Sequence, residues 1–371
     1  MPVLAFLVAV AFWPGLMDPA VTPRWAVIAV GLPLASRLDP RNIDPFLLGL
    51  AGMGTLWALW TLIAASPNRA IGGYELSHFL ILGLAFLAGA GLKSLDGVMT
   101  GLALGIGVSA AVCVAQLFGY DGVDQRMGSV PAGLFYNREM LVEFAAPVLV
   151  WTILRRRSVG VAASVLIPLL VCQSRLAVLA AACGLLYGWR ASPERKLAAL
   201  ILCSLVGAAS LFWLGEWKMV TAATRIGEWL AAIRNLTPFG LGLGWFRDHT
   251  FPDPSSAHSE PLQLMVEMGI GSIFWLAIPA VIWWRGAGGR VERAVFLAIC
   301  VEAALSFTLH QPAAGFVAAV GAGFMARRRS LVRMGEPELG GLDDRPEKSS
   351  SRGADKPIPR RPPRRRGAVP A

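Results

Sequence analysis

The stretch GVMTGLALGIGVSAAVCVAQLF, residues 97–118, has no charged residue and is long enough to cross a lipid bilayer as one α-helix. Similar apolar runs, separated by short polar connections, fill most of the 371-residue chain. Only 16% of the residues are charged and 55% are hydrophobic, whereas a soluble domain carries nearer a quarter of charged residues. We therefore predict an all-α, polytopic transmembrane helical bundle.

The apolar runs predict about twelve transmembrane helices, several of them shorter than the ~20 residues that a straight span requires. Their approximate bounds are 2–17, 24–36, 45–65, 76–92, 97–118, 139–154, 158–173, 174–190, 196–215, 259–284, 292–309 and 311–326. The stretch 158–190 can also be divided differently. We expect residues 1–326 to form a membrane domain and residues 327–371 to form a separate tail.

Positive charge predicts the orientation of this domain, because cytoplasmic connections carry an excess of lysine and arginine. Arginine-dense segments fall on alternate connections, at Arg37/Arg41, Arg155–Arg157, Arg190–Lys196, Arg285–Arg293 and Arg327–Arg329. Both termini are therefore predicted to be cytoplasmic. Other cations then fall on the outer side, namely Arg126, Arg138, Arg175, Lys218, Arg225, Arg234 and Arg247. Binding of an anion would account for cations on that side.

One of the four histidines, His258, lies at the predicted outer start of the apolar helix 259–284. An imidazole can take up or release a proton near neutral pH, so this position favours chemistry at the membrane surface. We expect Ser259 to cap the helix and Pro261 to occupy its first turn. His310 lies at a second outer helix junction and could line the same site, whereas we expect His78 and His249 at the surface or at the interface.

The longest outer segment, residues 216–257, is predicted to contain a short amphipathic helix over 221–235. Its apolar stripe, Ile226, Trp229, Leu230 and Ile233, suits a helix lying at the bilayer interface. Arg225 and Glu228 flank the stripe and can pair at i, i+3. Glycines at 240, 242 and 244 then allow the backbone to approach a ligand or another helix closely.

Residues 327–371 differ in composition from the rest of the chain. They hold 13 Lys and Arg against 6 Asp and Glu, a net +7 of the chain's +10, and few aliphatic residues. We expect this tail to be disordered and to contact anionic lipids of the inner leaflet rather than nucleic acid. A solvated tail that only helps to set the topology is the alternative.

Cysteines and acidic residues give no sign of a metal site. The five cysteines lie scattered in apolar runs, so we interpret them as packing residues. Glu143, Glu267 and Glu302 fall inside predicted spans, where a carboxylate indicates function. We expect Glu143, one turn in from the outer face, to pair with an arginine.

Four segments together resemble the superfamily of bacterial O-antigen ligases and O-antigen polymerases, which are envelope glycosyltransferases. They are Gly133–Arg138 followed by Ala145-Ala146-Pro147, Gln173–Ala177, Arg225–Trp229 with Pro238–Gly242, and His258-Ser259 with Gly269. They span about residues 126–272 in the family's order. Tyr136 and Ser272 depart from the family's pattern, and the chain is short for the family.

The resemblance implies a GT-C-like enzyme of the bacterial inner membrane. It would move a glycan from an undecaprenyl-diphosphate carrier to a hydroxyl of lipid A-core, another glycan or a protein at the periplasmic face. The family works without a metal or cofactor and inverts the sugar. His258 would be the general base, and Arg175 and Arg225 would hold the diphosphate. Asn137, Arg138, Glu143 and His310 are possible supporting residues.

Two alternatives remain open from the sequence. A repeat-unit polymerase of the same superfamily would carry out the same chemistry on a different acceptor. A polysaccharide or lipid transporter, such as a flippase, would also have about twelve helices and intramembrane carboxylates. No repeated half or matching pair of broken helices favours the transporter.

Overall fold

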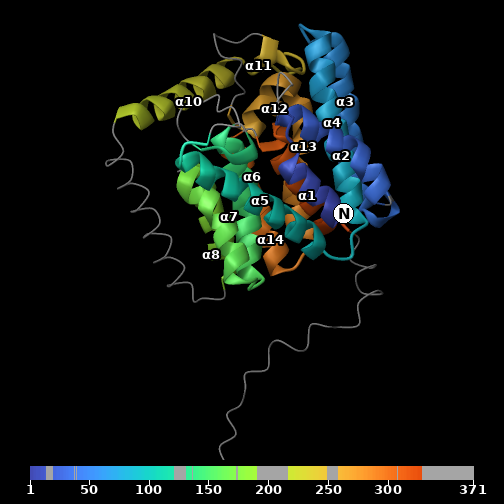
Figure 1. The fold of residues 1–371 in the computed structure, drawn as a ribbon. Helices are drawn as coiled ribbons and strands as arrows, with labels where there is room; N and C mark the ends of the chain where they lie inside the picture. Colours follow the sequence, from blue (N-terminus) through green and yellow to red (C-terminus); the bar gives the residue numbers. More distant parts are fainter. Residues whose placement is uncertain are drawn as a thin grey trace, which may run out of the picture. The chain divides into compact units, whose positions relative to one another are not determined.

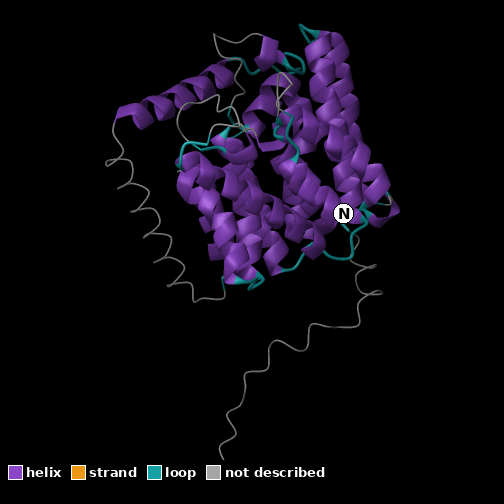
Figure 2. Cartoon of the chain, in the orientation of Figure 1, coloured by secondary structure: helices purple, strands orange, loops and turns teal. Residues whose placement is uncertain are grey.

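The computed structural model describes residues 1–13, 20–36, 38, 40–120, 131–135, 137–172, 174–189, 216–248, 258–306 and 308–327. Within these ranges the regular elements are helices (Figure 2). In addition, Ile43 and Arg327 form one isolated antiparallel bridge. The chain divides into two units, Met1–Val332 and Arg333–Ala371. The predicted basic tail beyond Arg327 lies outside the described residues, as do Arg37, Arg126, Gln173 and His249.

Eleven of the twelve predicted segments coincide with helices, and the twelfth, 196–215, lies outside the described residues (Figure 1). The α-helices are α1 Pro2–Val10, α2 Val21–Ala35, α3 Pro45–Ala64, α4 Arg69–Ala90, α5 Asp96–Leu117, α6 Arg138–Leu154, α7 Val159–Cys172, α8 Arg175–Gly188, α10 Glu216–Arg234, α11 Trp245–Asp248, α12 Glu260–Met268, α13 Ser272–Arg285, α14 Arg290–Leu305 and α15 Pro312–Met325. Four 3-10 turns, η1 Pro40–Asn42, η2 Gly133–Phe135, η3 Gly269–Gly271 and η4 Thr308–His310, complete the described elements.

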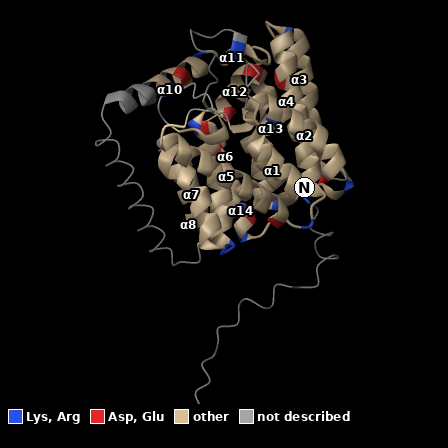
Figure 3. Ribbon diagram, viewed as in Figure 1, with Lys and Arg blue, Asp and Glu red and all other residues tan. Residues whose placement is uncertain are grey.

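Four of these helical segments are long and apolar enough to cross a membrane: α3, α4, α5 and the segment Glu260–Arg285, which comprises α12, η3 and α13. Shorter apolar helices, α2, α7, α8 and α15, accompany them. Figure 3 shows positions of charged residues at both ends of the described helical unit, and a smaller number within it. The length, composition and charge pattern of the helices are those of a membrane protein.

Several helices begin where a polar side chain satisfies the first free backbone N–H groups. The Asn68 side chain accepts hydrogen bonds from the N–H groups of Ala70 and Ile71, so α4 begins at Arg69, earlier than the predicted residue 76. Asn137 and Ser174 cap α6 and α8 in the same way. These caps fix the start of helices that carry the predicted site residues Arg138 and Arg175.

The core depends on close approach between helices at glycines. A Cβ atom at Gly89 of α4 would meet the carbonyl of Val320 in α15, and one at Gly323 would meet the carbonyl of Phe86. Small residues of this kind let helices pack closely in a bilayer, where lipid supplies no hydrophobic driving force. The α1–α5 contact follows the same rule, because a Cβ atom at Gly101 would meet the carbonyl of Pro2.

The arginine-dense connections between helices gather at one end of the described unit. Arg155 Nη2 lies 2.6 Å from Glu292 Oε1, and Arg155 Nε lies 3.6 Å from Asp96 Oδ1. The same end holds the Ala287 N–H, which donates to the carbonyl of Met325 (2.8 Å). Within the described residues, the connection at Arg155 thus meets the starts of α5 and α14, and the connection before α14 meets the end of α15.

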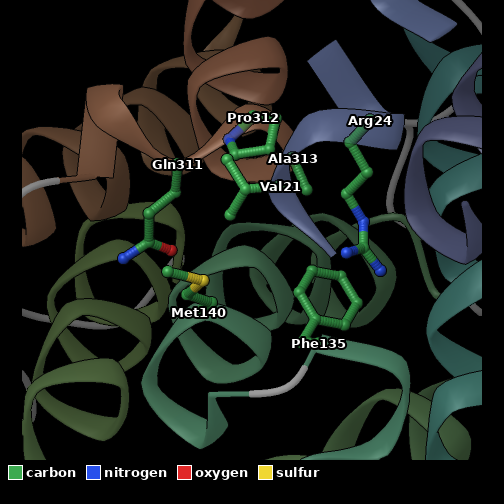
Figure 4. A pocket seen from close by; sticks show the side chains of 7 residues that line it. All are labelled: Val21, Arg24, Phe135, Met140, Gln311, Pro312 and Ala313. Carbon is green, nitrogen blue, oxygen red and sulfur yellow. The ribbon is translucent and has the colours of Figure 1, made fainter. Parts of the chain in front are cut away.

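Arg24 of α2 is fully buried and ties three segments together. Its guanidinium donates hydrogen bonds of 2.6–3.2 Å to the carbonyls of Val8, Ala9, Ala20 and Leu134. It also lies 3.9 Å from the centre of the Phe135 ring. Figure 4 shows this side chain beside a small cavity lined by Val21, Arg24, Phe135, Met140, Gln311, Pro312 and Ala313. Arg24 thus has a structural role in joining α1, α2 and η2.

Candidate functional site

His258 lies two residues before the first residue of α12 and has a strained backbone. Its φ of 46° lies in the left-handed region, which a non-glycine residue adopts mainly where the surrounding structure imposes it. Ser259 is the N-cap residue and Pro261 lies in the first turn, as predicted, but the Ser259 side chain makes no capping hydrogen bond. Capping by the Ser259 hydroxyl was therefore a wrong prediction.

The imidazole of His258 faces a carboxylate of α10. Its Nε2 lies 3.8 Å from Glu228 Oε2, and both side chains are about three-quarters buried, with 21% and 25% of their surface exposed. Burial, together with the positive charge of Arg225, lowers the pKa of His258, and Glu139 opposes this effect. Burial raises the pKa of Glu228, while Arg225 lowers it. The four ionisable groups, His258, Glu228, Arg225 and Glu139, thus interact electrostatically, and we call them the charged cluster.

Arg225 joins α10 to the start of α6. Its Nη2 lies 3.2 Å from Glu139 Oε2. Glu139 is itself oriented by Asn137, whose side chain accepts a hydrogen bond from the Glu139 N–H (2.8 Å). The sequence predicted pairing of Arg225 with Glu228 and of Glu143 with an arginine. The salt bridge of Arg225 is instead made with Glu139, four residues before Glu143.

Glu143 is buried against the turn between α14 and α15. It accepts hydrogen bonds from Ser306 Oγ (2.5 Å), Thr308 Oγ1 (3.4 Å) and Gln311 Nε2 (2.9 Å). These neutral donors take the place of the predicted arginine. Among the described residues Glu143 makes no salt bridge with an arginine, although Arg225 acts on it electrostatically. Its hydrogen bonds come from hydroxyl and amide groups more than 160 residues away in the chain.

Arg175 and Arg138 begin their helices near this end of the unit but are not joined to His258 by a contact. Arg175 is the first residue of α8, and its Nε and Nη2 atoms are buried without a hydrogen-bond partner among the described residues. Arg138 is the first residue of α6 and interacts electrostatically with Cys172. The structure therefore brings together Arg225 and His258, whereas no contact with Arg175 is found for either of them among the described residues.

A second cluster surrounds His310, in η4. Its Nδ1 lies 3.1 Å from Glu260 Oε2 and its Nε2 lies 3.4 Å from Glu75 Oε2. Burial alone would lower the pKa of His310, but Glu260, Glu75 and Glu267 together raise it to about 10. The carboxylates around this largely buried ring therefore favour its charged form.

Glu75 extends this second cluster toward the surface. Arg247 Nη1 lies 2.7 Å from Glu75 Oε1, and His78 Nδ1 lies 3.7 Å from Glu75 Oε2. His78 is buried and stacks on Trp25, with ring centres 4.4 Å apart, so the expectation of a surface or interfacial residue was wrong. In the part of the chain that the structure describes, no group of three or more His, Cys, Asp or Glu has the geometry of a metal site.

The glycine-rich segment after α10 packs on α12 rather than remaining open. The Leu241 N–H donates to the carbonyl of Val266 (2.8 Å) and the Gly242 N–H to that of Glu267 (3.0 Å). Gly240, Gly242 and Gly244 all have positive φ. Of the two predicted uses of these glycines, the described contacts show close approach to another helix, which fixes α12 beside the segment that follows α10.

Sequence reasoning missed Glu139 and Glu75 as site residues, and it assigned Glu228 to Arg225 rather than to His258. Their places in the sequence could have indicated both residues. Glu139 lies in the first turn of a helix capped by Asn137, and Glu75 lies three residues before His78, a spacing that brings two side chains together on a helix. Comparison with models of known protein families and with curated proteins found no match to the chain.

Proposed function

We propose that this protein is a membrane-embedded glycosyltransferase of the O-antigen ligase type. It transfers a glycan from an undecaprenyl-diphosphate carrier to an acceptor hydroxyl at the periplasmic face of the bacterial inner membrane, without a metal and with inversion. The observation that supports this most is the cluster of His258, Glu228, Arg225 and Glu139. It sets a titratable base beside a fixed cation, which is what the reaction requires.

In the proposed reaction the acceptor oxygen attacks C1 of the donor sugar. The new C1–O bond forms as the C1–O bond to phosphate breaks, and the electron pair leaves with undecaprenyl diphosphate. The acceptor proton passes to the neutral imidazole of His258, whose pKa is lowered by burial and by Arg225. Arg225 offsets the charge of the leaving diphosphate, and Arg175, with its unused buried donors, is the second candidate for this role.

Exposed apolar residues on α10 support a site at the membrane surface. Ile226, Leu230 and Ile233 are about half exposed along one face of the helix, where they suit contact with lipid. Arg225 and Glu228 on the same helix reach the charged cluster. A lipid-linked donor could thus keep its isoprenoid chain in the bilayer while its diphosphate reaches Arg225.

Reconstitution in liposomes tests the proposal. The wild-type protein, with a labelled undecaprenyl-diphosphate oligosaccharide, should release undecaprenyl diphosphate and label an acceptor in the presence of a chelator. Separate reactions with lipid A-core, with a second donor molecule and with a protein acceptor distinguish a ligase from a repeat-unit polymerase. Absence of transfer to all three acceptors would contradict the proposal.

A transporter is the second candidate, because one helix of the bundle holds a buried acidic residue with no hydrogen-bond partner among the described residues. Glu302 of α14 is fully buried, and neither of its carboxyl oxygens has a hydrogen-bond partner among the described residues. Intramembrane carboxylates of this kind occur in proton-coupled carriers. Movement of labelled donor between leaflets without cleavage of the sugar–phosphate bond would favour this candidate.

A further inference from the structure

The turn between α14 and α15 presents polar groups to two different helices. Ser306, Thr308 and Gln311 are at most 2% exposed, although their side chains are polar. Their side chains, with the backbone of the same turn, bond to Glu143 of α6 and Glu260 of α12. We call residues 306–311 the junction turn; Phe307 lies outside the described residues.

On the α6 side, the junction turn holds Glu143 by its three hydrogen bonds. Glu139 lies four residues earlier, on the same face of α6, and carries the salt bridge to Arg225. Since α6 is a continuous helix from Arg138 to Leu154, fixing Glu143 also fixes the rotation of its first turn. The junction turn therefore influences the position of Arg225, because it holds the helix that carries the salt-bridge partner Glu139.

On the α12 side, the junction turn and the first helical residue bond to each other. Glu260 Oε1 accepts from the N–H groups of Leu309 (2.6 Å) and His310 (3.3 Å), and the Glu260 N–H donates to the carbonyl of Ser306 (3.1 Å). His310 Nδ1 contacts the same carboxyl group at 3.1 Å. Glu260 lies two residues after His258, so these contacts hold the chain just beyond the strained imidazole.

We propose that the junction turn is a positioning element that sets His258 against Arg225. The turn bonds to α6, whose first turn carries Glu139, through Glu143, and to the start of α12, two residues after His258, through Glu260. Glu143, Glu260 and His310 are then positioning residues and not catalytic ones. This inference rests on the proposed function for its kinetic consequence but not for its geometry.

His310 contributes to the junction turn as a fixed positive charge. The groups that face its ring are Glu260, Glu75, Glu267 and Gln263, and Glu75 is in turn contacted by Arg247 and His78. An imidazolium between carboxylates makes stronger hydrogen bonds than a neutral ring does. Loss of this charge should loosen the Glu260 contacts and, with them, the start of α12.

The geometric test uses cross-linking and needs no enzyme assay. Cysteines are placed at Glu228 and His258 in a full-length chain with its native cysteines replaced by serine, held in nanodiscs and treated with a short bifunctional thiol reagent. We expect efficient cross-linking with the native junction turn and several-fold less with Glu260→Gln or Glu143→Gln. Glu292→Gln, which removes a carboxylate at the other end of α14 where it pairs with Arg155, is the matched control and should keep the native yield.

Equal cross-linking yields in all three variants would overturn the inference. If a glutamine variant does not fold, Ser306→Ala and His310→Gln each weaken the contacts on one side and give the same comparison. Because Glu260 and His310 act as one pair, the Glu260→Gln/His310→Gln double variant should lose no more cross-linking than the worse single variant. Additive losses would show that the pair does not act as a unit.

The kinetic test separates positioning from general stability. In the transfer assay, Glu260→Gln should lower kcat by about 10- to 100-fold while the KM for donor changes little, since a small misplacement of the base has effects of that size. Glu260→Asp, which keeps the charge, should recover part of the loss. A change in KM alone would overturn the positioning role, whereas lost cross-linking with no transfer by any form would refute only the proposed function.

Discussion

At the scale of single residues, the charged cluster combines opposite influences on one imidazole. Arg225 and burial favour the neutral ring of His258, while Glu139 favours the charged ring. Glu139 also holds Arg225, so the same carboxylate restrains the cation and limits its effect on the base. A base that is neutral in the resting site is ready to accept a proton from an acceptor hydroxyl.

His258→Ala should lower transfer by roughly 10²–10⁴-fold, the usual contribution of a general base. Binding of the lipid-linked donor should remain, because the arginines hold the diphosphate. Measurement of both quantities in reconstituted vesicles checks this expectation. Loss of donor binding together with transfer would reassign His258 to substrate holding.

The pH dependence of transfer should show the lowered pKa of His258. A lowered pKa keeps the base neutral further into acid, so the rate should fall only below the ordinary histidine value of 6.5. Arg225→Gln removes one cause of the lowering and should move this acidic limb to higher pH. Rate profiles of both forms check the sign. An acidic limb at or above 6.5 in the wild-type protein would contradict this electrostatic account.

Arg225→Lys and Arg175→Lys should each impair transfer nearly as much as the alanine variants do. A lysine supplies a point charge but not the planar pair of donors that matches a phosphate group. Arg234, exposed in the last turn of α10, is the control and should tolerate both changes. Full activity of both lysine variants would show that net charge alone is needed.

At the scale of elements, the backbone of residues 240–244, just after α10, depends on glycines with positive φ. A Cβ atom at Gly242 would meet the backbone of Ala65 and Ser66, and its φ of 95° disfavours any side chain. The Gly242 N–H also bonds to the carbonyl of Glu267. The turn that follows α3 and the end of α12 are therefore packed against the same glycine.

Gly242→Ala should destabilise the protein by more than the ~1–3 kcal/mol of backbone strain, because backbone atoms of Ala65 and Ser66 must also move. Gly83→Ala is the matched control, since a Cβ atom there meets nothing within 4 Å and alanine favours the helix. Thermal unfolding of the two purified variants in detergent provides the comparison. Equal stability of the two variants would refute the packing argument.

The bounds of a helix could be predicted from the sequence where hydropathy determines them, but not where polar contacts with distant residues determine them. The helix 97–118 was predicted almost to the residue, because its apolar run is uninterrupted. The start of α4 was missed, since Arg69, Glu75 and His78 interrupt the hydropathy. Glu75 and His78 are nevertheless buried. They contact each other, and they also contact residues far along the chain, Arg247 for Glu75 and Trp25 for His78. Such partners cannot be read from local sequence.

At the scale of the whole molecule, the order of charged and apolar segments predicted which residues share an end. His258 and Arg225 were expected on one face of the membrane domain, and in the structure Arg225 lies close enough to act electrostatically on His258. Their carboxylate partner Glu139 is 86 residues from Arg225, and the chain gives no local sign of that approach. The helix-to-helix contacts that decide it depend on packing at glycines and on the junction turn.

A membrane orientation follows for the full chain. Cysteine at Leu236, exposed after α10, should react with an impermeant thiol reagent from the periplasm, whereas cysteine at Ser158, exposed beside Arg155–Arg157, should react only after the inner membrane is permeabilised. Labelling of cells whose outer membrane alone is open checks this, in a chain with its native cysteines replaced. The reverse pattern would place the charged cluster in the cytoplasm.

The hydrogen bonds of Arg24 impose an order on the synthesis and packing of the first helices. One of its acceptors, the carbonyl of Leu134, lies 110 residues later in the chain. At a synthesis rate of ~5–20 residues per second, that acceptor leaves the ribosome roughly 5–20 s after Arg24. Until residue 134 is synthesised, the hydrogen bond from Arg24 to η2 cannot form. The contact between α2 and η2 therefore completes later in synthesis than the contacts of Arg24 with α1.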